Sequence, residues 1–132
     1  GLGIPAEPLF RSSYNPFHRF VGDCTIRASC KLTDQDWDSV YVGTAFEGFL
    51  YKNMPSGNSV WGTYLERMGY TQHIIPKAYL RGYTVRDFAN EHPHGKYLLV
   101  LDEHVVTVVD GDYYDTLDPG DEIPRYYWTK GE

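Results

Sequence analysis

The last third of the chain is made of short runs of strand-forming residues, and this feature limits the possible folds more than any other. Four runs rich in Val, Tyr, Leu and Ile occupy residues 96–101, 104–109, 112–117 and 123–128. β-branched and aromatic residues favour strands, and Asp-Glu, Asp-Gly and Pro-Gly turn signals separate these runs. The pattern predicts an antiparallel meander, in which each strand pairs with the one before it.

The preceding residues have helical spacing instead. Asp23 is a good N-cap for a helix that begins at or beside Cys24, and Thr33 with Asp36 resembles a capping box. The predicted segments are that first helix, a second helix at about 34–51, a third at 59–68, a short strand at 70–76 and a short helix from 84 to about 92. Helices followed by strands predict an α+β fold, with N-terminal helices packed on a C-terminal antiparallel sheet.

The length of 132 residues fits one compact domain. Pro5, Pro8 and Pro16 interrupt a segment without hydrophobic periodicity, so residues 1–20 are predicted to form an extended N-terminal arm, and residues 21–132 a single domain. The longest apolar runs, such as residues 97–101, are far too short to cross a bilayer. We therefore expect no membrane association.

The charge pattern also excludes some classes of partner. The net charge is -6, and Lys and Arg are dispersed, which argues against a nucleic-acid partner. His92 and His94 lack the further ligands that a zinc site needs, so no metal is expected. The N-terminal residues lack the pattern of a secretory signal, which favours a cytoplasmic location.

Cys24 is the candidate nucleophile. A thiol attacks as the thiolate, and the positive end of a helix together with an imidazolium lowers its pKa. The alternative is that Cys24 fills the core, as free cysteines often do. Cys30 lies inside the same predicted helix, away from its positive end, and is expected to be structural.

His104 is the candidate general base, because it opens a strand whose other residues, apart from one Thr, cannot transfer protons. A two-residue turn at Asp110-Gly111 would pair Val109 with Asp112 and place residues 104, 106, 115 and 117 on one face of the sheet. Asp115 would then lie diagonally opposite His104 and orient its ring. Asp118 is the alternative if the register slips by one residue. A structural role for His104, with a solvated Asp115, is the simpler alternative.

These segments resemble the papain-like cysteine peptidase superfamily. Residues 22–28, Gly-Asp-Cys-Thr-Ile-Arg-Ala, are followed by the His-initiated strand and then by residues 114–118, Tyr-Asp-Thr-Leu-Asp. The order Cys, His, Asp is that of the superfamily, although the Trp that often follows its third motif is absent. From Tyr14 to Trp128 the chain is also similar to small proteins of bacteriophages and gut Firmicutes, some described as bacteriocin-processing-like or papain-like peptidases. The resemblance implies a papain-like fold with Cys24, His104 and Asp115 as catalytic residues.

The oxyanion donor departs from the family pattern. Papain-like enzymes usually carry a Gln about six residues before the Cys, whereas this chain has His18 there and no Gln before Cys24. Asn15 and His18 are the candidate side-chain donors, and the backbone N–H of Cys24 is a third.

The expected function is that of a cysteine peptidase-like thiol hydrolase, which cleaves a peptide or isopeptide bond through an acyl-enzyme without a cofactor. Its partner would be a peptide or protein substrate. The expected location is the cytoplasm of a bacterial host cell, and association with the virion is the alternative. One alternative is an acyl transferase of the transglutaminase or deamidase type. Another is a catalytically silent papain-like module with a phage structural or host-interaction role. The oligomeric state is left open.

Overall fold

The computed structural model describes residues 15–19, 21–114 and 118–131, which form five helices and five strands. In chain order these elements are α1 (Cys24–Thr33), α2 (Trp37–Tyr51), α3 (Asn58–Arg67), β1 (Thr71–Ile74), α4 (Ala78–Arg81), α5 (Val85–Glu91), β2 (Lys96–Val100), β3 (Val105–Val109), β4 (Asp112–Tyr114) and β5 (Tyr126–Thr129). The predicted α+β class is confirmed. No helix in the described ranges combines the length and apolar character needed to cross a membrane.

The sheet is antiparallel, but its strand order corrects the predicted meander. The order is β1-β5-β2-β3-β4, so only β2, β3 and β4 follow one another as neighbours. β5 turns back across the sheet, pairs with β2 on one side and receives β1 on the other. Local turn signals specify hairpins, whereas the place of β5 depends on long-range packing.

The turn between β3 and β4 has the predicted form. Val109 pairs with Asp112, and the two residues between them, Asp110 and Gly111, have φ angles of 50° and 83°. Positive φ at both central residues is the signature of a type I′ turn, whose twist matches that of the two strands.

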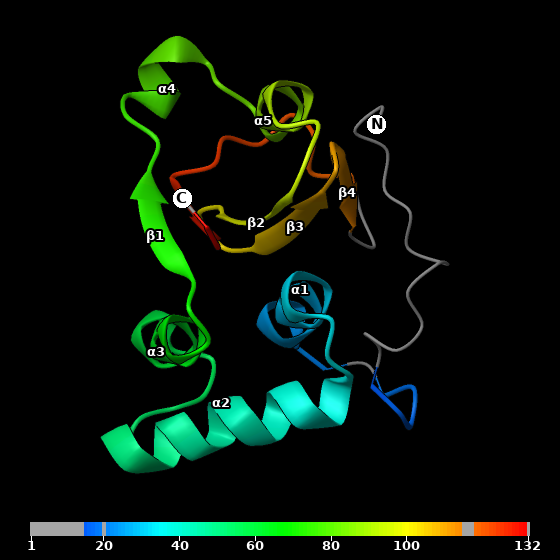
Figure 1. Ribbon diagram of the computed structural model, residues 1–132, viewed down its shortest axis with the longest axis vertical. Helices are drawn as coiled ribbons and strands as arrows, with labels where there is room; N and C mark the ends of the chain where they lie inside the picture. The colour runs from blue at the N-terminus through cyan, green and yellow to red at the C-terminus, as the bar shows by residue number, and fades with distance from the viewer. Residues whose placement is uncertain (1–14, 20, 115–117, 132) are drawn as a thin grey trace.

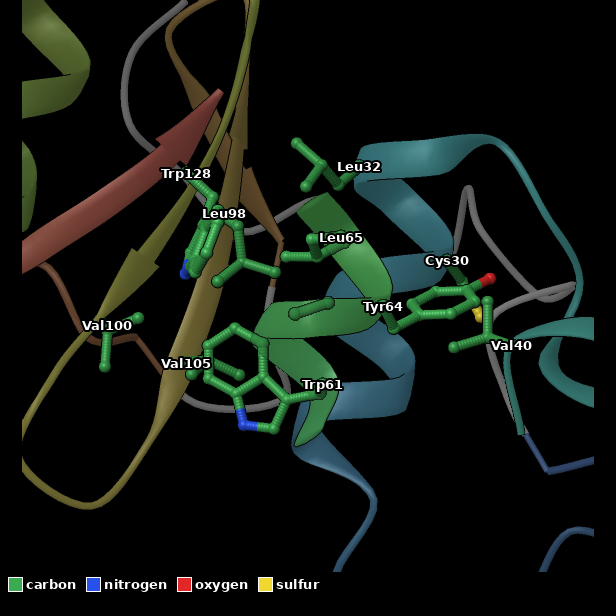
Figure 2. Packing of buried hydrophobic residues seen from close by; sticks show 11 residues of the cluster. Cys30, Leu32, Val40, Trp61, Tyr64, Leu65, Leu98, Val100, Val105 and Trp128 are labelled. Carbon is green, nitrogen blue, oxygen red and sulfur yellow. The ribbon is translucent and has the colours of Figure 1, made fainter. Parts of the chain in front are cut away.

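Helices cover both faces of the sheet, as Figure 1 shows, with α1 below β2 and β3 in that view and α5 above them. Each face has its own hydrophobic core. The first core lies between α1, α3 and the sheet, and Figure 2 shows the rings of Trp61 and Trp128 next to each other in it. The two rings pack edge to face, and their centroids are 6.3 Å apart. The second core lies under α5 and includes Phe88, Val106 and Tyr113. Two cores follow from alternation along β3, which sends Val106 and Thr107 to opposite faces.

The starts of two helices test the capping predictions. Thr84 and Asp87 form the predicted capping box at α5, with both reciprocal hydrogen bonds present. At α2 the predicted cap is wrong: Thr33 is the last residue of α1, and Asp36 itself caps α2 by accepting a hydrogen bond from the Ser39 N–H.

α4 was not predicted, because a helix of four residues has too little periodicity to be recognised in the sequence.

Candidate active site

Cys24 is the first residue of α1, as the sequence predicts, and its side chain is half-buried against the first core. α1 is held against the sheet by a buried hydrogen bond of 2.6 Å, in which the Thr107 hydroxyl donates to the carbonyl of Ala28. Because Thr107 belongs to β3, this bond fixes the position of α1 relative to the strand that follows His104. The thiol therefore has a set position relative to the end of the β2–β3 hairpin.

Asp23 occupies the N-cap position of α1, but its carboxylate does not cap the helix. It accepts hydrogen bonds from the Trp37 indole N–H at 2.8 Å and from Arg27 Nε at 3.0 Å. This largely buried carboxylate therefore joins the start of α1 to the start of α2. It also leaves the positive end of α1 uncapped by a side chain, with its partial charge available to the thiolate of Cys24.

His104 lies at the end of the turn that joins β2 to β3. The Leu101 N–H donates to the His104 carbonyl at 2.8 Å, so only Asp102 and Glu103 separate the two paired residues. Since β3 begins at Val105, His104 stands just outside the regular alternation of the strand. The arrangement differs from the predicted one, because Val106 packs into the core under α5 whereas the ring of His104 reaches Cys24 on α1.

The surroundings of Cys24 lower the pKa of its thiol below the ordinary value of 9.0. The largest cause is a side-chain hydrogen bond with His104, and burial opposes it by disfavouring the charged form. The charge of His104, a hydrogen bond from the backbone of Val105 and the charge of Arg27 lower the pKa further. Thiolate formation at Cys24 is thus supported by groups from α1 and from β3.

Cys30 has the opposite environment. Its side chain is 3% exposed, and burial raises the pKa of its thiol to about 12. It remains a thiol at neutral pH and fills the first core near Tyr64, as Figure 2 shows. The prediction that Cys30 is structural agrees with this position.

Cys24 and His104 open into a pocket of about 240 Å³. The residues that line it are Gly22, Cys24, Thr25, Ser56, Asn58, Val100, Leu101, Asp102, Glu103, His104 and Val105. They come from the start of α1, the β2–β3 hairpin and the start of α3. A substrate group in the pocket would therefore contact the thiol, the imidazole and the residues that begin α3.

Asn58 is a pocket residue that no sequence motif indicated. Its Oδ1 accepts a hydrogen bond of 3.1 Å from the indole N–H of Trp61, which is fully buried. An indole N–H can only donate, so this bond fixes which end of the Asn58 amide is oxygen and leaves the NH₂ group as a donor. Only the turn context of Asn58 was visible in the sequence, because its approach to Cys24 depends on how α3 packs.

The predicted third member of the triad, Asp115, lies outside the described residues, so its contact with His104 stays a prediction. The rival, Asp118, accepts hydrogen bonds from the Tyr113 hydroxyl at 2.7 Å and from the Gly120 N–H at 2.9 Å. These bonds, the first above all, lower the pKa of the Asp118 carboxyl. Tyr113 belongs to the core under α5, on the face of the sheet opposite α1. The observed role of Asp118 is to hold the turn that follows it.

Asn15 and His18, the predicted oxyanion donors, lie together in a turn before α1. The His18 N–H donates to the Asn15 carbonyl at 2.8 Å, and Asn15 Oδ1 accepts from the Phe17 N–H at 2.9 Å. Neither residue lines the pocket at Cys24. The structure thus brings Cys24 and His104 together with Asn58, and places Asn15 and His18 elsewhere on the surface.

The described ranges contain no group of three or more His, Cys, Asp or Glu side chains arranged to hold a metal ion. Comparisons with protein-family models, with curated proteins and with solved structures found no match to this chain.

Proposed function

We propose that the protein is a papain-like thiol hydrolase, with Cys24 as nucleophile and His104 as general base, that cleaves a peptide or isopeptide bond. The observation that carries the proposal is the hydrogen bond between the two side chains, in an open pocket at the start of α1, with the thiol pKa lowered. Cysteine reactivity requires an accessible thiolate; Cys24 is half-buried beside a pocket and its thiol pKa is lowered, whereas Cys30 is buried and its thiol pKa is raised.

In the proposed reaction, the Cys24 sulfur attacks the substrate carbonyl and its proton passes to His104. His104 then protonates the leaving amine as the C–N bond breaks, and a thioester to Cys24 remains. A water molecule, deprotonated by His104, cleaves the thioester, releases the acid and restores the thiol. Asp115 remains the proposed orienting residue for the imidazole.

The oxyanion formed during each attack needs donors that are already in place. The Asn58 NH₂ group is the side-chain donor that we assign to this role, because Trp61 holds the amide oxygen and leaves the NH₂ group free to donate into the pocket that Asn58 lines. The Cys24 backbone N–H, at the start of α1, is the second donor. Asn58 therefore replaces the Gln that papain-like enzymes carry before the nucleophile.

The test measures the rate of iodoacetamide labelling as a function of pH. In a Cys30→Ser background, where Cys24 alone reports, the labelling midpoint should lie below 9.0 and should rise in His104→Ala, because the hydrogen bond is lost while burial remains. Cys24→Ala, which keeps only Cys30, is the matched control and should label slowly until the fold is lost. Equal midpoints with and without His104 would refute the assigned pair.

Catalysis itself is tested with a fluorescence-quenched peptide mixture and with p-nitrophenyl acetate, with and without an added primary amine. Hydrolysis that requires both Cys24 and His104 supports the proposal. Product that appears only when the amine is added would favour an acyl transferase. A low-pKa thiol that never becomes acylated would favour a silent module.

A further inference from the structure

A group of exposed large apolar residues lies on the outer side of α2. Tyr41, Val42, Phe46 and Phe49 are 47%, 65%, 59% and 66% exposed. Figure 1 places α2 at one end of the molecule, with α1 and α3 on its inner side. Adjacent apolar residues of this size, exposed together, mark an interaction surface rather than ordinary exposure.

The outer side of α2 carries a regular stripe, made of Asp38, Val42, Ala45, Phe49 and Lys52. The spacing alternates between four and three residues, which is the heptad spacing of paired helices. The opposite side of α2 faces the protein, where Val40, Thr44 and Glu47 are buried. Glu47 pairs there with Arg67, so apart from Asp38 no charge of α2 lies on the stripe side.

The two ends of the α2 stripe carry opposite charges, and this selects the partner. Asp38 stands in the first turn of α2, and Lys52 is its C-cap residue. If two copies of α2 cross antiparallel at Ala45, each Asp38 lies beside the Lys52 of the other copy, and the apolar residues between them meet. A parallel pair would instead bring like charges together at both ends.

The surface also has a hollow that fits this pairing. A pocket of about 380 Å³ lies beside the C-terminal half of α2, lined by Ala45, Gly48, Phe49, Lys52, Asn53 and Met54. Ala45 and Phe49, two residues of the stripe, line this hollow, so an apolar side chain of the other copy can enter it. A lipid surface fits the charges less well, because the stripe begins with Asp38, Asp36 lies next to it, and the chain carries a net charge of -6.

We propose that α2 is a self-association surface, through which two copies of the chain form a two-fold dimer with antiparallel α2 helices. A helix of 15 residues is about 22 Å long, which gives an interface at the small end of the range for specific complexes. The dissociation constant should therefore be on the order of micromolar. The pocket at Cys24 is formed without α2, so the dimer does not depend on the proposed chemistry.

The test is sedimentation velocity of the full chain over a range of concentrations. The wild type should move from monomer to dimer with increasing concentration, and Phe49→Glu should weaken the dimer by about 100-fold or more, because the substitution occurs twice in a two-fold interface. Leu80→Glu is the matched control, since Leu80 is 86% exposed but lies on α4, and it should leave the dimer unchanged. Circular dichroism checks that each variant keeps its fold.

Charge reversal tests the antiparallel arrangement. Asp38→Lys and Lys52→Asp should each weaken self-association by about tenfold, since each brings like charges together twice. The double variant, and an equimolar mixture of the two single variants, should restore the dimer. A wild type that stays monomeric at every concentration would overturn the proposal, as would a dimer that tolerates Phe49→Glu, absence of rescue in the double variant, or binding to lipid vesicles without dimer formation.

Discussion

Cys24 and Cys30 lie on the same helix but have opposite electrostatic surroundings. The pKa of the Cys24 thiol is lowered, chiefly by its hydrogen bond with His104, whereas burial raises the pKa of Cys30 to about 12. Because the two shifts are opposite, the Cys24 thiol ionises at a lower pH than the Cys30 thiol. The same helix thus carries the thiol that we propose as the nucleophile and a second thiol with which its ionisation can be compared.

Asn58 can be separated experimentally from the thiol it is proposed to assist. Asn58→Ala should lower the rate of acylation by p-nitrophenyl acetate by about 100-fold, because one oxyanion donor is lost. Alkylation by iodoacetamide is a direct displacement with no oxyanion, so its rate and pH midpoint should stay the same. Ser59→Ala, at the next position of α3 and outside the pocket at Cys24, is the control. A parallel loss of both reactions would show that Asn58 acts only on the fold.

At the scale of elements, the contact between α1 and β3 fixes the position of Cys24 relative to His104. Thr107 is fully buried, and its hydroxyl is held by the Ala28 carbonyl. Replacing the hydroxyl with a methyl group keeps the volume but removes the bond between the helix that carries Cys24 and the strand that follows His104. The position of α1 and the reactivity of Cys24 should change together.

Thr107→Val should therefore lower the free energy of unfolding by about 1 kcal/mol, measured by urea denaturation. It should also slow iodoacetamide labelling of Cys24 at neutral pH, because a looser contact with His104 raises the thiol pKa. Thr107→Ser keeps the hydroxyl and should retain the labelling rate. If the Val variant loses stability while labelling is unchanged, the bond supports the fold and does not position the thiol.

The same scale shows what could be predicted from the sequence. The Asp110-Gly111 turn, the Thr84 capping box and the start of α1 at Cys24 depend on neighbouring residues, and all three were predicted. The cap of α2 was missed by three positions, because Thr33 and Asp36 are both acceptable N-caps and only packing separates them. Asn58 could not have been found in this way, since its neighbours in the pocket are distant in the sequence.

At the scale of the whole molecule, β5 joins parts of the chain that would otherwise stay apart. It pairs with β1 on one side and with β2 on the other. Trp128 of β5 packs against Trp61 of α3, and the ring lies close enough to Gly62 that an added Cβ there would be 3.1 Å from it. The first core therefore needs residues from near both ends of the described chain.

Trp128→Ala should lower the free energy of unfolding by about 3–5 kcal/mol, because Trp128 is 4% exposed and its removal leaves a cavity between α3 and the sheet. The loss should appear in urea denaturation followed by the fluorescence of the remaining tryptophans. Trp128→Phe fills part of the space and should cost less. A small loss in the Ala variant would mean that the first core closes without β5.

The place of β5 in the sheet also affects the order of events while the chain is being made. β1 leaves the ribosome before the other strands, but the only neighbour that the described sheet gives it is β5, whose residues follow more than fifty positions later. Until those residues emerge, β1 has no strand to pair with in the described sheet, and Trp61 lacks the Trp128 ring that packs against it. The first core, against which the Cys24 side chain packs, therefore cannot be completed until β5 has been synthesised.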